Sequence, residues 1–428
     1  MDSKTVRAKH AELLFPCVAN YYEEPIVLTQ GDGCCVRDAD GREYLDFFGG
    51  ILTLGLGHAH PDVTQRVQEQ AARLVHTSTL YPTEEIVRVA ERLATITPGK
   101  LKKSFFTTSG TEADETATLL ARLYTGSQEI IVLRHGYAGR SLQAIAITGH
   151  SPWRLIPSQV AGIKHALAPY CYRCPLGLEY PSCEVKCAQD IEELIRTETT
   201  GKPAAFMAEP IQGVGGFITP PKEYFEIAVG IIRKYGGVFI CDEVQTGFGR
   251  LGDHWCGIEH WGVDPEIMTF AKSIANGFPV GATIANEEVA NAFTGLTIST
   301  FGGNPISMAA TEATLDVMER ENTPKRSAER GKQLRQHLES FKEKYPFIGD
   351  VRGMGLMQGV ELVEDRKTKE PAPKKALQLM EAAKQHGLLL GKGGLYGSVI
   401  RIAPSMLVSK SEIDEGARRL DLALAGVT

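Results

Sequence analysis

The chain has 428 residues, of which 43% are hydrophobic and 23% charged, and its formal net charge is −6. This composition is ordinary for a soluble protein with two or three folding units, and no basic block predicts nucleic-acid binding. No apolar run approaches the roughly 18 residues that span a bilayer. The first twenty residues mix charged and apolar positions, unlike a signal or transit peptide, so we expect a cytoplasmic protein without membrane partners.

The N-terminal segment, residues 1–60, has short β-like runs at Ile26–Thr29 and Cys34–Arg37 but no obvious core of its own. We therefore expect it to pack with the C-terminal part of the chain. From about residue 102, apolar runs of strand length alternate with helical patterns such as Thr111–Tyr124. This alternation predicts an α/β domain with a mainly parallel sheet over residues 61–322. Its expected strands are Lys103–Thr107, Glu129–Leu133, Ala204–Ala208, Gly237–Cys241, Ile267–Phe270 and Val280–Ile284.

The composition changes near Glu319, where residues 319–345 become charged and helical. The turn Gly353-Met354-Gly355 leads into an apolar strand, Met357–Leu362. We predict a separate α+β unit over residues 323–428, which also contains helices near Lys374–His386 and Ser411–Leu424 and a strand near Val399–Ile402.

The strongest chemical signal is a carboxylate on one strand and a lysine on a later one. Asp242 ends an apolar strand, and Lys272 follows another about thirty residues later. Ligands bind at the carboxyl edge of open α/β sheets. A carboxylate there can keep a pyridine nitrogen protonated, and a lysine can form an imine with an aldehyde, as pyridoxal phosphate (PLP) requires. Either residue alone could instead cap a turn or lie on the surface.

A phosphate site is expected at Ser109-Gly110-Thr111, which follows a strand and opens a helix. The free N–H groups and the dipole of a helix N-terminus favour an anion. Ser109 and Glu112 also have the spacing of a capping box, which needs no ligand. Taken together with Asp242 and Lys272, however, this segment favours a PLP site.

Two further side chains are candidates at this site. Tyr137 could stack on a flat cofactor, although such a tyrosine is more often simply half-buried. Arg401 lies between apolar neighbours in a strand, and its guanidinium suits a carboxylate partner in the substrate or, equally well, in the protein.

Two other patterns have simpler interpretations. The glycines of residues 247–252 match a dinucleotide-binding pattern, but no amphipathic helix follows them, so we interpret the segment as a loop. Cys171, Cys174, Cys183 and Cys187 could hold a structural zinc ion, remain free or form a disulfide. Since no regular second Cys-x-x-Cys pair is present, we favour a structural role without metal and assign no metal to the active site.

Together these motifs resemble the class III aminotransferases among the fold-type I PLP enzymes, over nearly the whole chain. The resemblance is strongest to the alanine–glyoxylate aminotransferase 2 group and the ω-transaminases. It rests on strings such as His76-Thr77-Ser78-Thr79, Glu209-Pro210-Ile211-Gln212-Gly213-Val214, Asp242 to Arg250 and Arg401 to Met406. It implies a large domain with a mainly parallel seven-stranded sheet and a smaller α+β domain built from both termini.

The resemblance also implies residue roles. Lys272 would hold PLP as a Schiff base and move the substrate proton, and Asp242 would pair with the pyridine nitrogen. The phosphate would lie against Ser109, Gly110 and Thr111, and Thr300 would reach the phosphate of a neighbouring subunit in a homodimer, or possible tetramer, with shared active sites. The ring would contact Tyr137, Val244 and Gln245, with Glu209 nearby, and Arg401 would bind the substrate carboxylate.

The sequence departs from the family pattern at three positions. Ala138 replaces the histidine usual after the aromatic residue, and Thr108 replaces the usual asparagine. Neither change removes a group that imine chemistry needs. Val214 stands where ornithine-type relatives carry a glutamate that masks the arginine, so Arg401 should stay available for α-carboxylates.

The resemblance implies a ping-pong transfer of an amino group from an amino acid or ω-amine, such as alanine or β-alanine, to pyruvate or glyoxylate. A PLP-dependent phospholyase acting on a phosphorylated amino alcohol would share every cofactor residue, and an aminomutase would need no separate acceptor. A nicotinamide-dependent oxidoreductase using the 247–252 loop is the alternative from another class, and a non-catalytic scaffold is the least favoured.

Overall fold

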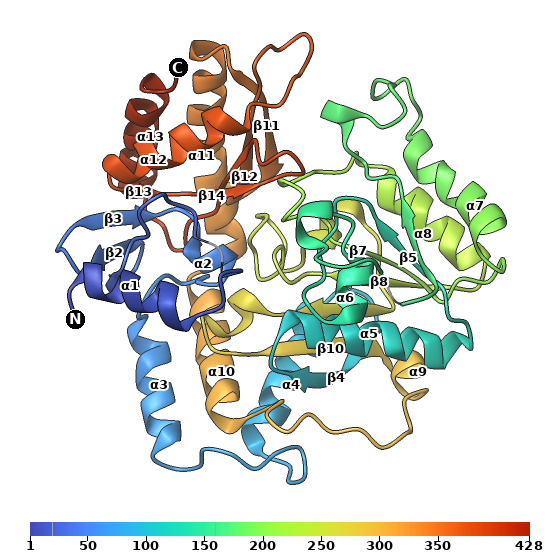
Figure 1. The fold of residues 1–428 in the computed structure, drawn as a ribbon. Coiled ribbons are helices and arrows are strands. Elements are labelled where there is room, and N and C mark those ends of the chain that lie inside the picture. Colours follow the sequence, from blue (N-terminus) through green and yellow to red (C-terminus); the bar gives the residue numbers. More distant parts are fainter. Residues whose placement is uncertain (19, 159) are drawn as a thin grey trace.

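The largest sheet has seven strands in the order β4-β10-β9-β8-β7-β5-β6 (Figure 1). The computed structural model describes residues 1–18, 20–158 and 160–428. Strand β10 is antiparallel to both of its neighbours, and the other strands run in one direction. The fold class is therefore confirmed. The strands are β4 (Leu101–Thr107), β5 (Ile130–Leu133), β6 (Ile163–Ala166), β7 (Ala205–Ala208), β8 (Val238–Asp242), β9 (Ile267–Phe270) and β10 (Gly281–Asn286).

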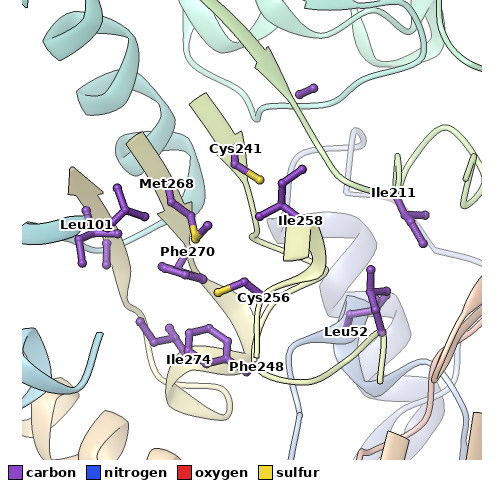
Figure 2. Close-up of a cluster of buried hydrophobic side chains, with 14 of the residues drawn as sticks. Leu52, Leu101, Ile211, Cys241, Phe248, Cys256, Ile258, Met268, Phe270 and Ile274 are labelled. Carbon is purple, nitrogen blue, oxygen red and sulfur yellow. The ribbon is translucent and has the colours of Figure 1, made fainter. Parts of the chain in front are cut away.

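Successive residues of each central strand enter different hydrophobic clusters, which explains why the strands are apolar throughout. In β5, Ile130 and Val132 pack with α5 (Gly110–Thr125). Ile131 and Leu133 belong to the cluster of α7 (Lys186–Glu198) and α8 (Tyr224–Lys234). Figure 2 shows the core beside β8 and β9, where side chains from both strands meet those of the loop that follows β8: Cys241, Met268, Phe270, Phe248, Cys256 and Ile258.

Two four-stranded sheets lie outside this domain. One is antiparallel, in the order β11-β12-β15-β14, and comes entirely from the C-terminal part. The other, β1-β2-β3-β13, joins both ends of the chain, because β13 pairs in parallel with β3. The strands are β1 (Leu28–Asp32), β2 (Cys35–Asp38), β3 (Glu43–Asp46), β11 (Ile348–Met354), β12 (Met357–Leu362), β13 (Leu388–Leu389), β14 (Gly391–Gly393) and β15 (Val399–Ile402).

The N-terminal strands share a core with the C-terminal helices (Figure 1). Cys34, Leu45 and Phe47 pack in one cluster with residues of α11, α12 and α13. The domain boundaries at residues 60 and 322 stay a prediction. The other helices are α1 (Ser3–Leu13), α2 (Gly49–Leu52), α3 (Pro61–Ala71), α4 (Glu84–Ile96), α6 (Leu142–Ile147), α9 (Glu287–Ala290), α10 (Pro305–Arg320), α11 (Thr323–Lys344), α12 (Pro373–Gln385) and α13 (Lys410–Ala425).

The structure contains five strands that were not predicted from the sequence, β3, β6, β11, β13 and β14, and it divides one helical stretch. Strand β6 lies at the sheet edge and carries Lys164 and His165, and β11 contains Gly349 and Arg352, so neither is a continuous apolar run. The charged stretch 319–345 covers the end of α10 and the whole of α11, which are separated at Asn322 by a left-handed backbone turn (φ 50°). Among the described residues, no helix is both long and apolar enough to cross a membrane.

Candidate active site

A cavity of about 310 Å³ opens at the carboxyl ends of the parallel strands β7, β8 and β9, and β4 also ends there. This is the sheet edge at which ligands bind in open α/β folds. Nine of the predicted site residues line this cavity: Ser109, Gly110, Thr111, Tyr137, Glu209, Asp242, Val244, Gln245 and Lys272. A cavity of this size is at the lower end of the range for small-molecule sites.

Asp242 is the last residue of β8 and is buried. Its Oδ1 accepts a hydrogen bond from the backbone N–H of Val244 (2.9 Å). Burial raises the pKa of Asp242 to about 6, against the lowering effects of this N–H and of Lys272. Near neutral pH the side chain therefore supplies a negative charge to the wall of the cavity.

Lys272 follows β9 after one residue, and its backbone lies in the left-handed region (φ 50°). A non-glycine residue in this region is strained, and such strain is concentrated at functional sites. Burial lowers the pKa of Lys272, while Asp242 and Glu209 raise it. A lowered pKa makes the neutral, nucleophilic amine more accessible.

The N-terminus of α5 faces the cavity and is also capped. Ser109 Oγ accepts from the N–H of Glu112 (3.3 Å), and Glu112 Oε2 accepts from the N–H of Thr108 (2.8 Å). The N–H groups of Gly110 and Thr111 have no acceptor among the described residues. A Cβ on Gly110 would lie 3.3 Å from both methyl groups of Val244, so the backbone approaches the cavity wall closely. Capping and anion binding are thus compatible here, because they use different N–H groups.

Glu209 follows β7 and holds two neighbouring loops. Its carboxylate accepts from the N–H of Tyr137 (3.1 Å) and from the N–H of Gly213 (2.7 Å). The Tyr137 ring lines the cavity and packs edge-on against Trp153 (5.7 Å between centroids). Burial, and then Asp242, raise the pKa of Glu209 to about 8.

The raised pKa of Glu209 predicts a pH-dependent stability of the cofactor-free protein. Between pH 4.5 and about 8 the unfolded state loses a proton that the folded state retains, so stability falls as pH rises, by up to about 1.4 kcal/mol per pH unit. A Glu209→Gln variant has no such proton. Urea unfolding at pH 5.5 and 7.5 measures the free energy of unfolding of both proteins. The value for the variant, relative to that of the natural protein, should be higher at pH 7.5 than at pH 5.5. If the difference in free energy of unfolding between the two proteins were the same at both pH values, the protonated state of Glu209 would be contradicted.

Two of the predicted residues lie outside the cavity lining. Arg401 on β15 is buried, and its guanidinium donates to the carbonyls of Lys392 (3.1 Å) and Gly213 (3.4 Å) and to the Tyr21 hydroxyl (3.3 Å). It also packs over the Phe48 ring (4.8 Å). No carboxylate within the described part of the chain forms an ion pair with Arg401. Thr300 is exposed, in a loop before α10.

Residues 17–424 match the family described as aminotransferase class-III. The chain is a class III aminotransferase. It is 42% identical, over 99% of its length and 88% of the relative's, to an Arabidopsis thaliana protein named alanine–glyoxylate aminotransferase 2 homolog 2, mitochondrial. A solved Bacillus anthracis aminotransferase matches with a TM-score of 0.93 and 30% identity over 99% of both chains. Membership confirms the predicted family, enzyme type and PLP cofactor.

Two other solved structures bear on the specificity of the aminotransferase. An amine transaminase from an uncultivated Pseudomonas species, in a PLP-bound form, matches with a TM-score of 0.91 and 29% identity over 97% and 99% of the two chains. An Arthrobacter phospholyase in complex with phosphoethanolamine matches equally well, with a TM-score of 0.91 and 29% identity over 99% and 100%. The fold therefore accommodates more than one reaction, as is common for widely used folds.

The cavity contains a further acid that was not predicted from the sequence. Asp114 on α5 is buried, lines the cavity and accepts a hydrogen bond from Thr269 Oγ1 on β9 (2.8 Å). Burial, and then Asp242, raise the pKa of Asp114 well above its usual value. The available signal was its position in the same helix as Ala113 and Ala117, whose side chains are also buried.

Two sequence patterns were not assigned to the active site, the glycine-rich segment 247–252 and the cluster of four cysteines, and the structure places both outside its lining. Residues 247–252 form turns, and Arg250 within them is buried and donates to the carbonyls of Leu356 and Pro404, which links the large domain to the C-terminal part. Cys171, Cys174, Cys183 and Cys187 are free thiols around a small cavity beside α7. Across the described residues, no three His, Cys, Asp or Glu side chains are grouped as a metal ion would need.

Proposed function

We propose that the enzyme transfers an amino group from an amino acid or ω-amine, such as alanine or β-alanine, to a small keto acid such as pyruvate or glyoxylate. The observation that carries this proposal is Arg401, a buried guanidinium without a carboxylate partner in the described chain. Such a group suits the carboxylate that amino acids and keto acids share. The name of the Arabidopsis relative supports the same pair of substrates.

The residues around the cavity suit PLP, which supplies an electron sink when it is bound. Lys272 would hold its aldehyde carbon, and Asp242 would hold the proton on its pyridine nitrogen. The unpaired N–H groups of Gly110 and Thr111, with Ser109, would bind the phosphate. Tyr137 and Val244 would contact the two faces of the ring, and Gln245, whose buried Oε1 has no described partner, would reach its hydroxyl group.

The proton transfer is assigned to Lys272. An incoming amine would first take the place of Lys272 and leave its Nζ free. The free Nζ of Lys272 can then take the proton from the substrate carbon that bears the amino group. The neighbouring carboxylates keep Nζ from becoming too weak a base, while burial prevents its permanent protonation. Each half of a ping-pong reaction would use the same nitrogen.

The visible spectrum of the purified protein tests the proposed reaction. A yellow protein whose band disappears with L-alanine and returns with pyruvate or glyoxylate would support it. The Arthrobacter neighbour makes a phospholyase the second candidate. Release of inorganic phosphate from phosphoethanolamine, without a response to L-alanine, would establish that alternative instead. The family assignment leaves no support for the oxidoreductase.

Arg401 provides a test of substrate class. We expect Arg401→Gln to lower kcat/KM for L-alanine by about 100-fold, because a charged hydrogen-bonding pair is lost. An amine donor that lacks a carboxylate should react at nearly the natural rate in its own half-reaction, which is measured in single turnovers. A similar loss for both donors would mean that Arg401 supports the fold and does not bind substrate.

We further propose a homodimer with shared sites, in which Thr300 reaches the phosphate of the neighbouring subunit. The loop that contains Thr300 also exposes the apolar side chains of Leu296, Ile298 and Phe301, which suits burial in an interface. The cytoplasmic location stays a prediction, because the Arabidopsis relative is named mitochondrial.

Mixing two inactive variants tests this arrangement. Thr300→Glu should repel the phosphate of the opposite site, and Lys272→Ala disables its own site. If the sites are shared, a mixed dimer has one site with both natural residues and therefore about half the activity of a natural dimer. Random refolding of equal amounts of the two variants makes half of the dimers mixed, so the mixture should recover up to about a quarter of the natural activity. Mixtures no more active than the separate variants would contradict the shared site.

A further inference from the structure

A second, smaller cavity of about 20 Å³ adjoins the cofactor cavity. Four residues line both cavities: Tyr137, Ala138, Glu209 and Asp242. Gln212 lines only the smaller one, where the remaining wall is mostly apolar. A cavity needs roughly 10–15 Å³ to hold one water molecule, together with two to four polar partners. The size of this cavity therefore corresponds to one water molecule.

Gln212, which lines this cavity, has an unpaired polar atom. The residue is only 1% exposed, and its Nε2 donates to the carbonyl of Arg134 (2.8 Å). Its Oε1 has no hydrogen-bond partner among the described residues. Leaving a buried acceptor unpaired costs about 1–3 kcal/mol, so a donor is expected nearby.

The other two polar groups are the carboxyls of Glu209 and Asp242, whose hydrogen bonds within the described residues all come from backbone N–H groups. Glu209 accepts from Tyr137 and Gly213, and Asp242 accepts from Val244. If both acids were ionised, they and Gln212 Oε1 would give a water three acceptors for its two protons. A proton on Glu209 removes this excess, since the carboxyl can then donate to the water. The raised pKa of Glu209 agrees with that protonation at neutral pH.

We propose that this cavity binds one structural water, which accepts a hydrogen bond from protonated Glu209 and donates to Asp242 and to Gln212 Oε1. Gln212 Oε1 and the proton of Glu209 then each have a hydrogen-bond partner. Ala138 leaves the space open, because a larger side chain at this position would compete for it. Glu209 and Gln212 become positioning residues that act through the water on Asp242.

The water has a chemical consequence that rests on the proposed role of Asp242 at the pyridine nitrogen. A donor to Asp242 that carries no net charge stabilises the ionised carboxylate while leaving its charge available to the cofactor. Lys272, Asp114 and Arg401 are other charged or titratable groups that act on this pair of acids. The variants below leave all three unchanged.

Crystallography of the full-length protein at about 1.5 Å or better, with and without PLP, tests the water directly. We expect one ordered water within hydrogen-bond distance of Glu209, Asp242 and Gln212 Oε1 in both forms. A cavity without a water, or a water that contacts none of the carboxyls, would overturn the proposal. The cofactor-free form makes this result independent of whether the enzyme is a transaminase.

Two variants test whether the water acts on Asp242. Gln212→Met removes one partner of the water at similar side-chain volume, and Ala138→Val fills the space. With ¹⁵N-labelled PLP bound, we expect each to lower the pH at which the pyridine nitrogen loses its proton by about one unit, a tenfold change. Glu209→Gln keeps a donor and should retain the water in the crystal.

The matched control is Gln358→Met. Gln358 is also buried, its Nε2 also donates to backbone carbonyls, those of Gly331 (2.9 Å) and Gly355 (2.8 Å), and its Oε1 is also unpaired among the described residues. It lies on β12, outside the cofactor cavity. The coupling to Asp242 would be overturned if the pyridine nitrogen of the Gln212 and Ala138 variants lost its proton at the same pH as in the natural protein. It would also be overturned if the Gln358 variant shifted this pH by the same amount as they do.

Discussion

Replacing Lys272 by alanine is expected to remove the visible absorption of covalently held cofactor and to slow transamination by about 10⁴-fold. The loss is large because one nitrogen both holds the cofactor and moves the substrate proton. The measurement combines the absorption spectrum with single-turnover rates for L-alanine. Added amines that partly restore the rate would show that the missing function is a base.

Lys164→Ala is the matched control for this variant. Lys164 lies on the edge strand β6 and pairs with Glu198 at 3.3 Å, away from the cavity. Its replacement should leave both the spectrum and the rate unchanged. If the Lys272 variant kept the band, the assignment of Lys272 as the cofactor-binding residue would be wrong.

Asp242→Asn is expected to lower kcat by about 10³-fold, with a smaller effect on cofactor binding. The amide oxygen of asparagine can still accept from the N–H of Val244, so the local backbone should be retained. What is lost is the negative charge that would keep the pyridine nitrogen protonated. Single-turnover kinetics should place the loss in the proton-transfer step, because that step depends on the electron sink.

Asp38→Asn is a suitable control for the Asp242 variant. Asp38 is a buried strand residue that accepts from backbone N–H groups and from the Tyr44 hydroxyl, and it is not part of the cavity lining. It should affect melting temperature more than rate. A rate for Asp242→Asn within tenfold of the natural enzyme would contradict the proposed role of the carboxylate.

The central sheet was predictable because its strands are buried on both faces and are therefore continuous apolar runs. Strands β6 and β11 were not, since an edge strand or a strand with one polar face carries charged residues such as Lys164 and Arg352. Such segments form strands because they pair with a neighbouring strand. A short-range sequence pattern therefore does not predict them.

At the site, the strand-end positions of Asp242 and Lys272 were visible in the sequence because strand ends bring side chains to one sheet edge. Asp114 was overlooked despite its position near the buried Ala113 and Ala117, since a polar residue in an amphipathic helix usually faces water. Its burial follows from the approach of α5 to Thr269 on β9. Whether Arg401 meets a carboxylate of the protein is likewise a tertiary property, and three scattered segments supply its acceptors.

The pairing of β3 with β13 has a consequence for synthesis on the ribosome. The N–H of Leu45 donates to the carbonyl of Gly387, and that of Phe47 to the carbonyl of Leu389, so these bonds form only after more than 340 further residues have been made. Until then one edge of β3 is open to other chains, a known hazard for aggregation. Strands β1 to β3 are therefore among the last to be completed although they are made before the large domain, which can fold in the meantime.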